Sequence, residues 1–232
     1  QRFALAGKKI ITLAYGKPSG VESIRATFPS ITLAGKLNLD QDAKLSGNAD
    51  LEITGRLNPY FSMAADSSRV KKLLNGAFSE KAVEKYIISN LSAEKTTVAY
   101  TLQNKESLKE TSGVYFFEIP ALSSGTESWH MTELVSQRAE PLEIPFPVNE
   151  SYNYVISLPS NMELISKEAS VEMKKDFGEL KITIRKNSDK VEISKSIRVS
   201  QTVMSPEQYD AFRNFINTWN SRKYSEMILQ KK

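Results

Sequence analysis

Alternation of apolar and polar residues dominates the chain and predicts a mainly β protein. Leu33, Leu37 and Leu39 alternate with polar residues along 31–39, and residues 45–57 repeat the pattern after the polar stretch 40–44. Two period-2 runs joined by a short polar turn are typical of a β-hairpin. We expect Asp40 and Asp42 to cap this turn with their own side chains rather than to bind calcium.

The same periodicity indicates further strands. Residues 3–15, 96–102, 114–119, 152–158 and 171–173 are rich in aliphatic, aromatic and β-branched residues. A second hairpin is predicted over 180–199, with its turn at 187–189. Lys195 interrupts the apolar face of its return strand. That lysine indicates either a β-bulge or a rim position, where the stem packs and the ammonium reaches water.

Two stretches follow a helical spacing instead. Asp66 and Ser79 are suitable caps for two short helices, which predicts a helical insertion over about 66–91. Ser205 followed by Pro206 and Gln208 has the form of a capping box and predicts a helix over about 205–220. We expect that helix to be docked, because it carries one apolar stripe: Tyr209, Phe212, Ile216 and Trp219.

Three prolines in seven residues, Pro141, Pro145 and Pro147, interrupt the pattern. Proline lacks an N–H and favours extended geometry in the residue before it, so 138–147 should be neither a helix nor a central strand. This seam divides the chain into two predicted domains. Residues 1–137 form a β-rich region with the helical insertion, and residues 138–232 form a C-terminal β-sandwich that the last helix closes. The predicted fold is therefore an antiparallel β-sandwich or pair of sandwiches.

Composition narrows the possible chemistry. The 232 residues are 40% apolar and 25% charged, with a net charge of +4 and a pI of about 9.0. Basic and acidic residues are interspersed, which argues against nucleic-acid binding, and no apolar run is long enough for a transmembrane helix. Cysteine is absent and His130 is the one histidine. We therefore predict no catalytic residue, no cofactor and no metal site.

Several motifs resemble one family. Arg138-x-Glu-Pro-Leu-x-x-Pro-Phe-Pro147 is followed by Tyr154-x-Ile-x-Leu-Pro159, then Phe177-Gly178, a hairpin, and Ser205-Pro-Glu-Gln-Tyr-Asp-Ala-Phe-Arg-Asn-Phe215. This order resembles the C-terminal portion of secreted bacterial transglutaminase-like proteins, some of which are described as proteases. In that family a transglutaminase or papain-like core with Cys, His and Asp precedes a β-rich domain of unknown function. The start at Gln1 rather than Met suggests a processed chain or a piece of a longer protein.

The resemblance implies a non-catalytic accessory region, periplasmic or on the cell surface, whose partner is the catalytic core of its parent chain. Two alternatives remain open. Trp129, Tyr152 and Tyr154 could form an aromatic surface that binds a glycan or a peptide, although such residues more often fill sandwich cores. A glycoside hydrolase with paired carboxylates would need a spacing that a sequence does not reveal.

Overall fold

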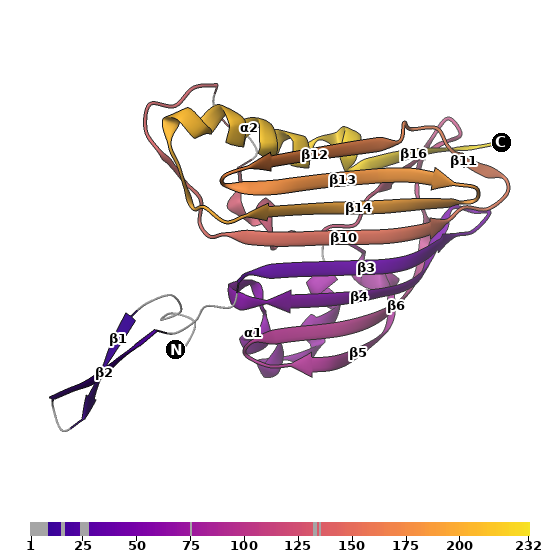
Figure 1. Cartoon of the computed structure of the whole chain (residues 1–232). Helices are drawn as coiled ribbons and strands as arrows, with labels where there is room; N and C mark the ends of the chain where they lie inside the picture. Colours follow the sequence, from indigo (N-terminus) through magenta and orange to yellow (C-terminus); the bar gives the residue numbers. More distant parts are fainter. Residues whose placement is uncertain (1–8, 15–16, 24–27, 75, 132–133, 135) are drawn as a thin grey trace.

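An eight-stranded sheet forms the centre of the molecule (Figure 1). The computed structural model describes residues 9–14, 17–23, 28–74, 76–131, 134 and 136–232. The strand order of the large sheet is β12-β13-β14-β10-β3-β4-β6-β5. Its strands are β3 (Ser30–Leu39), β4 (Lys44–Thr54), β5 (Val83–Leu91), β6 (Lys95–Ser107), β10 (Val148–Ser157), β12 (Ala169–Lys175), β13 (Gly178–Asn187) and β14 (Lys190–Val199).

Smaller sheets complete the β structure. A four-stranded sheet contains β11 (Met162–Leu164), β16 (Glu226–Lys231), β8 (Val114–Glu118) and β7 (Lys109–Thr111), in that order. Two pairs stand apart: β1 (Lys9–Ala14) with β2 (Lys17–Ser23), and β9 (Leu142–Glu143) with β15 (Val203–Met204). The predicted mainly β fold is thus confirmed. Of the first predicted strand, residues 3–8 and 15 lie outside the described residues.

Both predicted hairpins are present. β3 pairs with β4 in antiparallel register, and the Asp40 carboxylate caps their turn by accepting from the N–H groups of Asp42 and Lys44, each at 2.9 Å. β13 pairs with β14 through a turn in which Ser188 has a positive φ of 58°. Local alternation and turn residues were therefore sufficient to locate these two units.

Helix α2 (Pro206–Asn220) begins where its cap predicts. The Ser205 side chain and the Gln208 side chain form the reciprocal capping box. Phe212 and Phe215 pack edge to face against Phe177, which precedes β13, with ring centres 5.6 and 5.4 Å apart. All these rings are buried, so the helix closes one side of the core.

The helical insertion is shorter than predicted. Within 66–91 the 3-10 helices η3 (Ser67–Leu74) and η4 (Glu80–Ala82) are present, but residues 83–91 form the edge strand β5. Helix α1 (Tyr60–Ala65) and the 3-10 helix η2 (Gly55–Leu57) precede the predicted insertion. Two irregularities in the pairing of β5 with β6, at Val83/Lys85 and Ile88/Asn90, break the period of two. These bulges leave apolar residues at a spacing that imitates a helix.

One strand pair joins the two halves of the sequence. β3 and β10 lie side by side in parallel, from Asn149 opposite Ser30 to Ser157 opposite Asn38. The large sheet therefore continues through residues on both sides of the predicted boundary at 137/138, and that division remains a prediction. In the seam itself, only Leu142 and Glu143 form a strand, which agrees with the expected extended geometry.

The large sheet has one covered face and one open face. On β10, alternate residues from Val148 to Ile156 point into the core, towards α2 and the four-stranded sheet. The opposite face carries polar side chains such as Asn48, Asp50 and Asn153, which line a hollow of about 570 Å³. Among the described residues, no helix is long and apolar enough to cross a bilayer.

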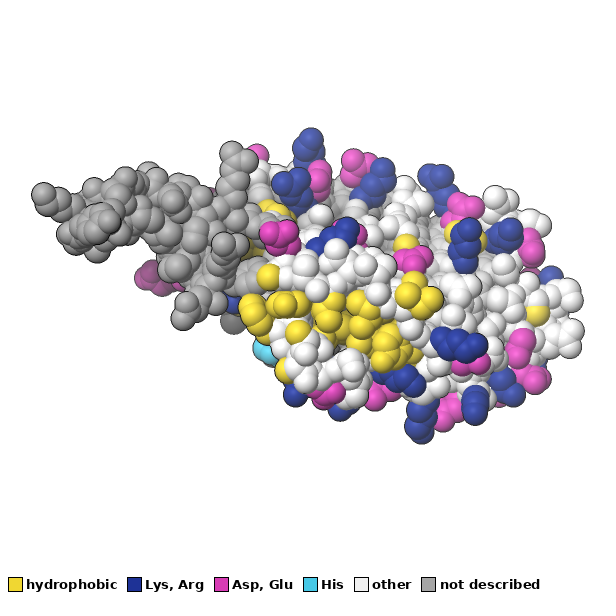
Figure 2. Space-filling view, turned by 90° about the horizontal axis from the view of Figure 1, so that it is seen from below, with side chains coloured by type: hydrophobic (Ala, Val, Ile, Leu, Met, Phe, Trp, Pro, Cys, Tyr) yellow, Lys and Arg dark blue, Asp and Glu magenta, His cyan; other side chains and the backbone are white. Residues whose placement is uncertain are grey.

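Apolar side chains are exposed near the β5 edge. Figure 2 views the molecule from the side of β5 and α1, and a group of apolar side chains is gathered on the face that it shows. Phe61 of α1 and Ile87 of β5 are 61% and 71% exposed. Contiguous exposed apolar surface of this kind often marks a contact with another protein surface.

Candidate functional site

The three aromatic residues proposed as a ligand surface lie inside the protein. Trp129 is 6% exposed, Tyr152 1% and Tyr154 2%. Tyr152 and Tyr154 point from β10 into the core, and Trp129 ends the 3-10 helix η5 (Thr126–Trp129). Because all three rings are buried, they are not available for stacking against a ligand. These three residues therefore do not form the aromatic binding surface that was the alternative prediction.

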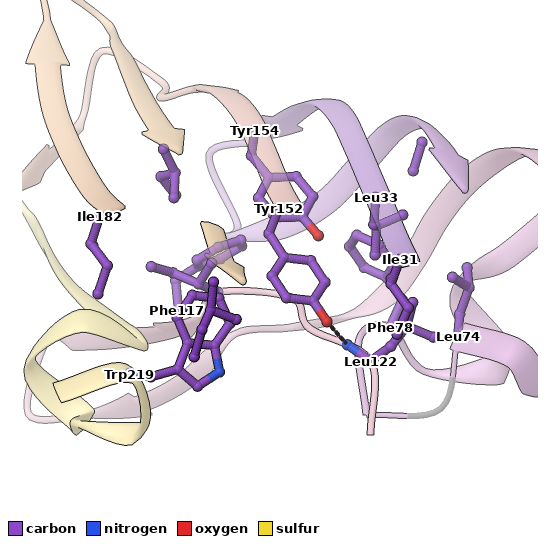
Figure 3. Close-up of a cluster of buried hydrophobic side chains, with 14 of the residues drawn as sticks. Ile31, Leu33, Leu74, Phe78, Phe117, Leu122, Tyr152, Tyr154, Ile182 and Trp219 are labelled. Carbon is purple, nitrogen blue, oxygen red and sulfur yellow. Dashed lines mark hydrogen bonds between the residues drawn. The ribbon is translucent and has the colours of Figure 1, made fainter. Parts of the chain in front are cut away.

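The two tyrosines instead connect the layers of the core. The Tyr152 hydroxyl accepts from the Leu122 N–H at 3.2 Å (Figure 3). The Tyr154 hydroxyl donates to the Pro120 carbonyl at 2.7 Å. Both partners lie in the segment that follows β8, so the phenols hold this segment against β10. Burial raises the pKa of both phenols well above 10.

A buried carboxylate, Glu150, lies next to Tyr152 on the same face of β10. One oxygen accepts from the Thr126 N–H at 2.5 Å, and the other accepts from the Tyr152 O–H at 2.6 Å. The segment after β8 can approach this carboxylate because residue 125 is a glycine. A Cβ at Gly125 would overlap the Glu150 carboxyl group. Burial raises the pKa of Glu150 above 4.5, although the bonds from Tyr152 and Thr126 oppose this shift.

A buried amine faces the same region from β14. Lys195 lies opposite Tyr152 in an uninterrupted antiparallel register, so the strand has no bulge there. The side chain is only 5% exposed, which also differs from a rim lysine that reaches water. Its ammonium donates to the Ser225 hydroxyl at 3.2 Å and lies 4.7 Å from the centre of the Trp219 ring. Desolvation lowers the pKa of Lys195 to about 8, opposed by the Glu150 charge.

Helix α2 supplies the aromatic wall of this region. The Trp219 ring stacks on Tyr152, with centres 6.1 Å apart, and its indole N–H donates to the Thr126 hydroxyl at 3.0 Å. Thr126 thereby links α2 to Glu150, since its own N–H donates to that carboxylate. The position of Lys195 thus depends on β10, β14, η5 and α2 together.

A cavity of about 460 Å³ lies beside these groups. This volume falls within the usual range for small-molecule sites. Its walls combine polar and apolar side chains: Thr126, Glu127, Glu150, Lys195, Asn220 and Ser225 with Ala121, Leu122, Met131 and Trp219. Lys195 is the one lysine or arginine among these wall residues, and Glu127 is exposed. The described residues contain no cluster of acidic and histidine side chains that could hold a metal ion.

The sequence contains a signal for the Glu150–Lys195 cluster that a search for known motifs does not detect. Along 148–156, Glu150 occupies an inward position in a series of otherwise apolar or aromatic residues. A charged residue at an inward position of a strand is rare unless it is hydrogen-bonded. The interruption at Lys195 was noticed, but only the fold shows that Glu150 and Lys195 face the same space.

The fold and this cavity define a mainly β domain in which two charged side chains, Glu150 and Lys195, are buried in the core. The chain belongs to the family described as "Domain of Unknown Function with solved-structure structure (DUF3858)", whose model matches residues 112–229. No curated protein matches the sequence.

Two solved structures are similar to the chain. A "putative protease" from Parabacteroides distasonis ATCC 8503 is 19% identical, with a TM-score of 0.47 over 60% of this chain and 31% of that one. A two-domain M1 zinc metallopeptidase bound to L-arginine is 8% identical, with a TM-score of 0.29 over 89% of this chain and 43% of that one. The chain thus spans less than half the length of either structure.

Proposed function

We propose that this chain is a non-catalytic accessory region of a larger, secreted transglutaminase-like bacterial protein. Its role would be to support and orient a catalytic core that is encoded outside these 232 residues, in the periplasm or at the cell surface. The match over residues 112–229 to a domain of unknown function is consistent with such a role. So is the absence of cysteine from the sequence, since a thiol is the nucleophile of that class of core.

The observation that supports the proposal most is the distribution of apolar and reactive groups. Side chains able to do acid–base chemistry, such as Glu150 and Tyr152, are buried and bonded to one another in the core. Large apolar side chains, Phe61 and Ile87, are exposed on α1 and on the free edge strand β5. A domain of this kind is suited to packing against a neighbour through its surface.

The experiment compares the isolated chain with the protein encoded by its full open reading frame. Amine incorporation into a glutamine-containing peptide and hydrolysis of peptide bonds are measured for both. We expect no turnover by the isolated chain, and turnover by the full protein that falls when Ile87 is replaced by lysine. Turnover by the isolated chain, or a reading frame without a Cys-His-Asp core, would refute the proposal. Glu84→Gln, at an exposed polar position of β5, makes the same change in charge and is the matched control.

A further inference from the structure

We infer that the cavity beside Lys195 binds the carboxylate group of a small organic acid whose remaining part is apolar. The inference goes beyond the accessory role and does not depend on the parent protein having an active core. It rests on three features of the cavity: an ammonium group with unused donors, neutral hydrogen-bonding groups next to it, and an apolar wall.

The ammonium group is the first feature. A lysine ammonium has three N–H donors, and the Ser225 hydroxyl is the one hydrogen-bond acceptor that the described residues offer to Lys195. No carboxylate among the described residues lies within 4.0 Å of it. Burial of a charge with so few partners is costly, because water is removed without an equivalent replacement. An anion in the adjoining cavity would provide the missing acceptors.

Glu150 does not fill this role. Both of its oxygens already accept hydrogen bonds, from Thr126 and Tyr152, which hold the carboxylate against η5 rather than against Lys195. Burial also favours its protonated, neutral form. Glu127, the other carboxylate at the cavity, is exposed and hydrated. Neither carboxylate at the cavity therefore takes up the Lys195 donors that Ser225 leaves unused.

The other walls define the class of ligand. Ser225, which already contacts the Lys195 ammonium, and the Asn220 amide are neutral donors in the cavity wall. Trp219, Leu122 and Met131 form an apolar surface for the rest of the molecule. A carboxylate attached to an aromatic or aliphatic group matches this arrangement better than inorganic phosphate, which would leave the apolar wall uncovered.

The test is an NMR titration of the 232-residue chain. The sequence contains two tryptophans, and the Trp219 indole N–H reports directly on the cavity, whereas Trp129 is not among its wall residues. The probe is 3-phenylpropionate, and its matched control is 3-phenylpropionamide, which has the same shape without the charge. We expect a saturable shift of the Trp219 signal with Kd on the order of 1 mM or lower for the acid, and binding weaker by about tenfold or more for the amide.

A variant pair locates the charge. Lys195→Met keeps the length of the stem and removes the ammonium, and should weaken binding of the acid by about tenfold or more. Lys181→Met, at a 63% exposed side chain on the outer face of β13, should bind as the unmodified chain does. Equal binding of acid and amide, a shift that does not saturate, or unchanged binding by Lys195→Met would each overturn the inference. The amide comparison uses the unmodified chain and so does not depend on how the variant folds.

The source of the carboxylate is distinguished by a second pair of probes. Glycyl-phenylalanine carries a peptide C-terminus, and its C-terminal amide does not. Binding of the dipeptide with the same dependence on Lys195 would assign the site to peptide C-termini. Binding of 3-phenylpropionate without binding of the dipeptide would assign it to free organic acids.

Discussion

The buried ammonium of Lys195 should give the protein an unusual dependence of stability on pH. Its pKa is about 8 in the folded chain and 10.5 when the side chain is exposed. Between these values the unfolded state holds a proton that the folded state has lost. The free energy of unfolding must then rise with pH, by about 1.4 kcal/mol for each pH unit. Because the folded state is still half protonated at pH 8, the expected gain from pH 8 to 9.5 is about 1.6 kcal/mol.

The measurement is urea unfolding followed by tryptophan fluorescence between pH 7 and 9.5, in buffers without organic carboxylates. The upper limit of pH 9.5 avoids ionisation of Tyr152 and Tyr154 in the unfolded state, which begins near pH 10. Because the pKa values of both phenols are raised in the folded state, that ionisation would lower the free energy of unfolding. Lys195→Met should be flat over this range and more stable than the unmodified chain at pH 7. Lys181→Met, at an exposed site, should retain the rise.

Two results would refute this reasoning. A free energy of unfolding that is flat or falling from pH 8 to 9.5 would mean that Lys195 keeps its ordinary pKa, and hence that solvent or a charge partner reaches it. The same rise in Lys195→Met would assign the dependence to another group.

Three further predictions concern the core around this site. Phe212→Ala removes a fully buried ring from α2 and should cost about 3–5 kcal/mol in urea unfolding, whereas a loss below about 1 kcal/mol would mean that the helix face is not packed. Gly125→Ala should cost about 1–3 kcal/mol, because its Cβ overlaps the Glu150 carboxyl group; adding Glu150→Ala should recover part of that loss in a double-mutant cycle, and strict additivity would contradict the overlap. Because the pKa of Glu150 is raised in the folded state, the free energy of unfolding of the unmodified chain should fall as the pH rises from 4.5 through the raised pKa. Glu150→Gln should abolish this fall in denaturation curves measured from pH 4 to 7. A fall that persists in Glu150→Gln would assign the pH dependence to another group.

The strands of the large sheet were mostly predictable because their information is local. Residues 31–39 and 180–199 combine alternation with turn residues, and both hairpins formed as expected. The helix after Ser205 was predictable for the same reason, since its cap lies within four residues. Strand β5 was not, because its bulges remove the period of two and its identity depends on pairing with β6.

Long-range pairing accounts for most of what the sequence did not reveal. Nothing near Ser30 or Asn149 indicates that their strands lie in parallel, since parallel neighbours need a crossover and have no turn signature. The cavity has the same origin: Glu150 and Lys195 are on different strands, and Trp219 is on α2. Their shared space became visible only when four elements were placed together. The three aromatic residues predicted to be ligand contacts are instead buried, because the residue type alone does not distinguish a core position from a surface position.

The parallel β3–β10 pair also constrains how the protein is made. Roughly 120 residues separate the two partners, so the middle of the sheet cannot form until the chain has been synthesised beyond Ser157. Until then the nascent chain would expose the unpaired edge of β3, whose inward side chains Ile31 and Leu33 are fully buried in the finished protein. During this interval β3 would be open to pairing with other chains, so the central strand of the mature sheet is also its point of greatest exposure to chaperones and to aggregation during biosynthesis.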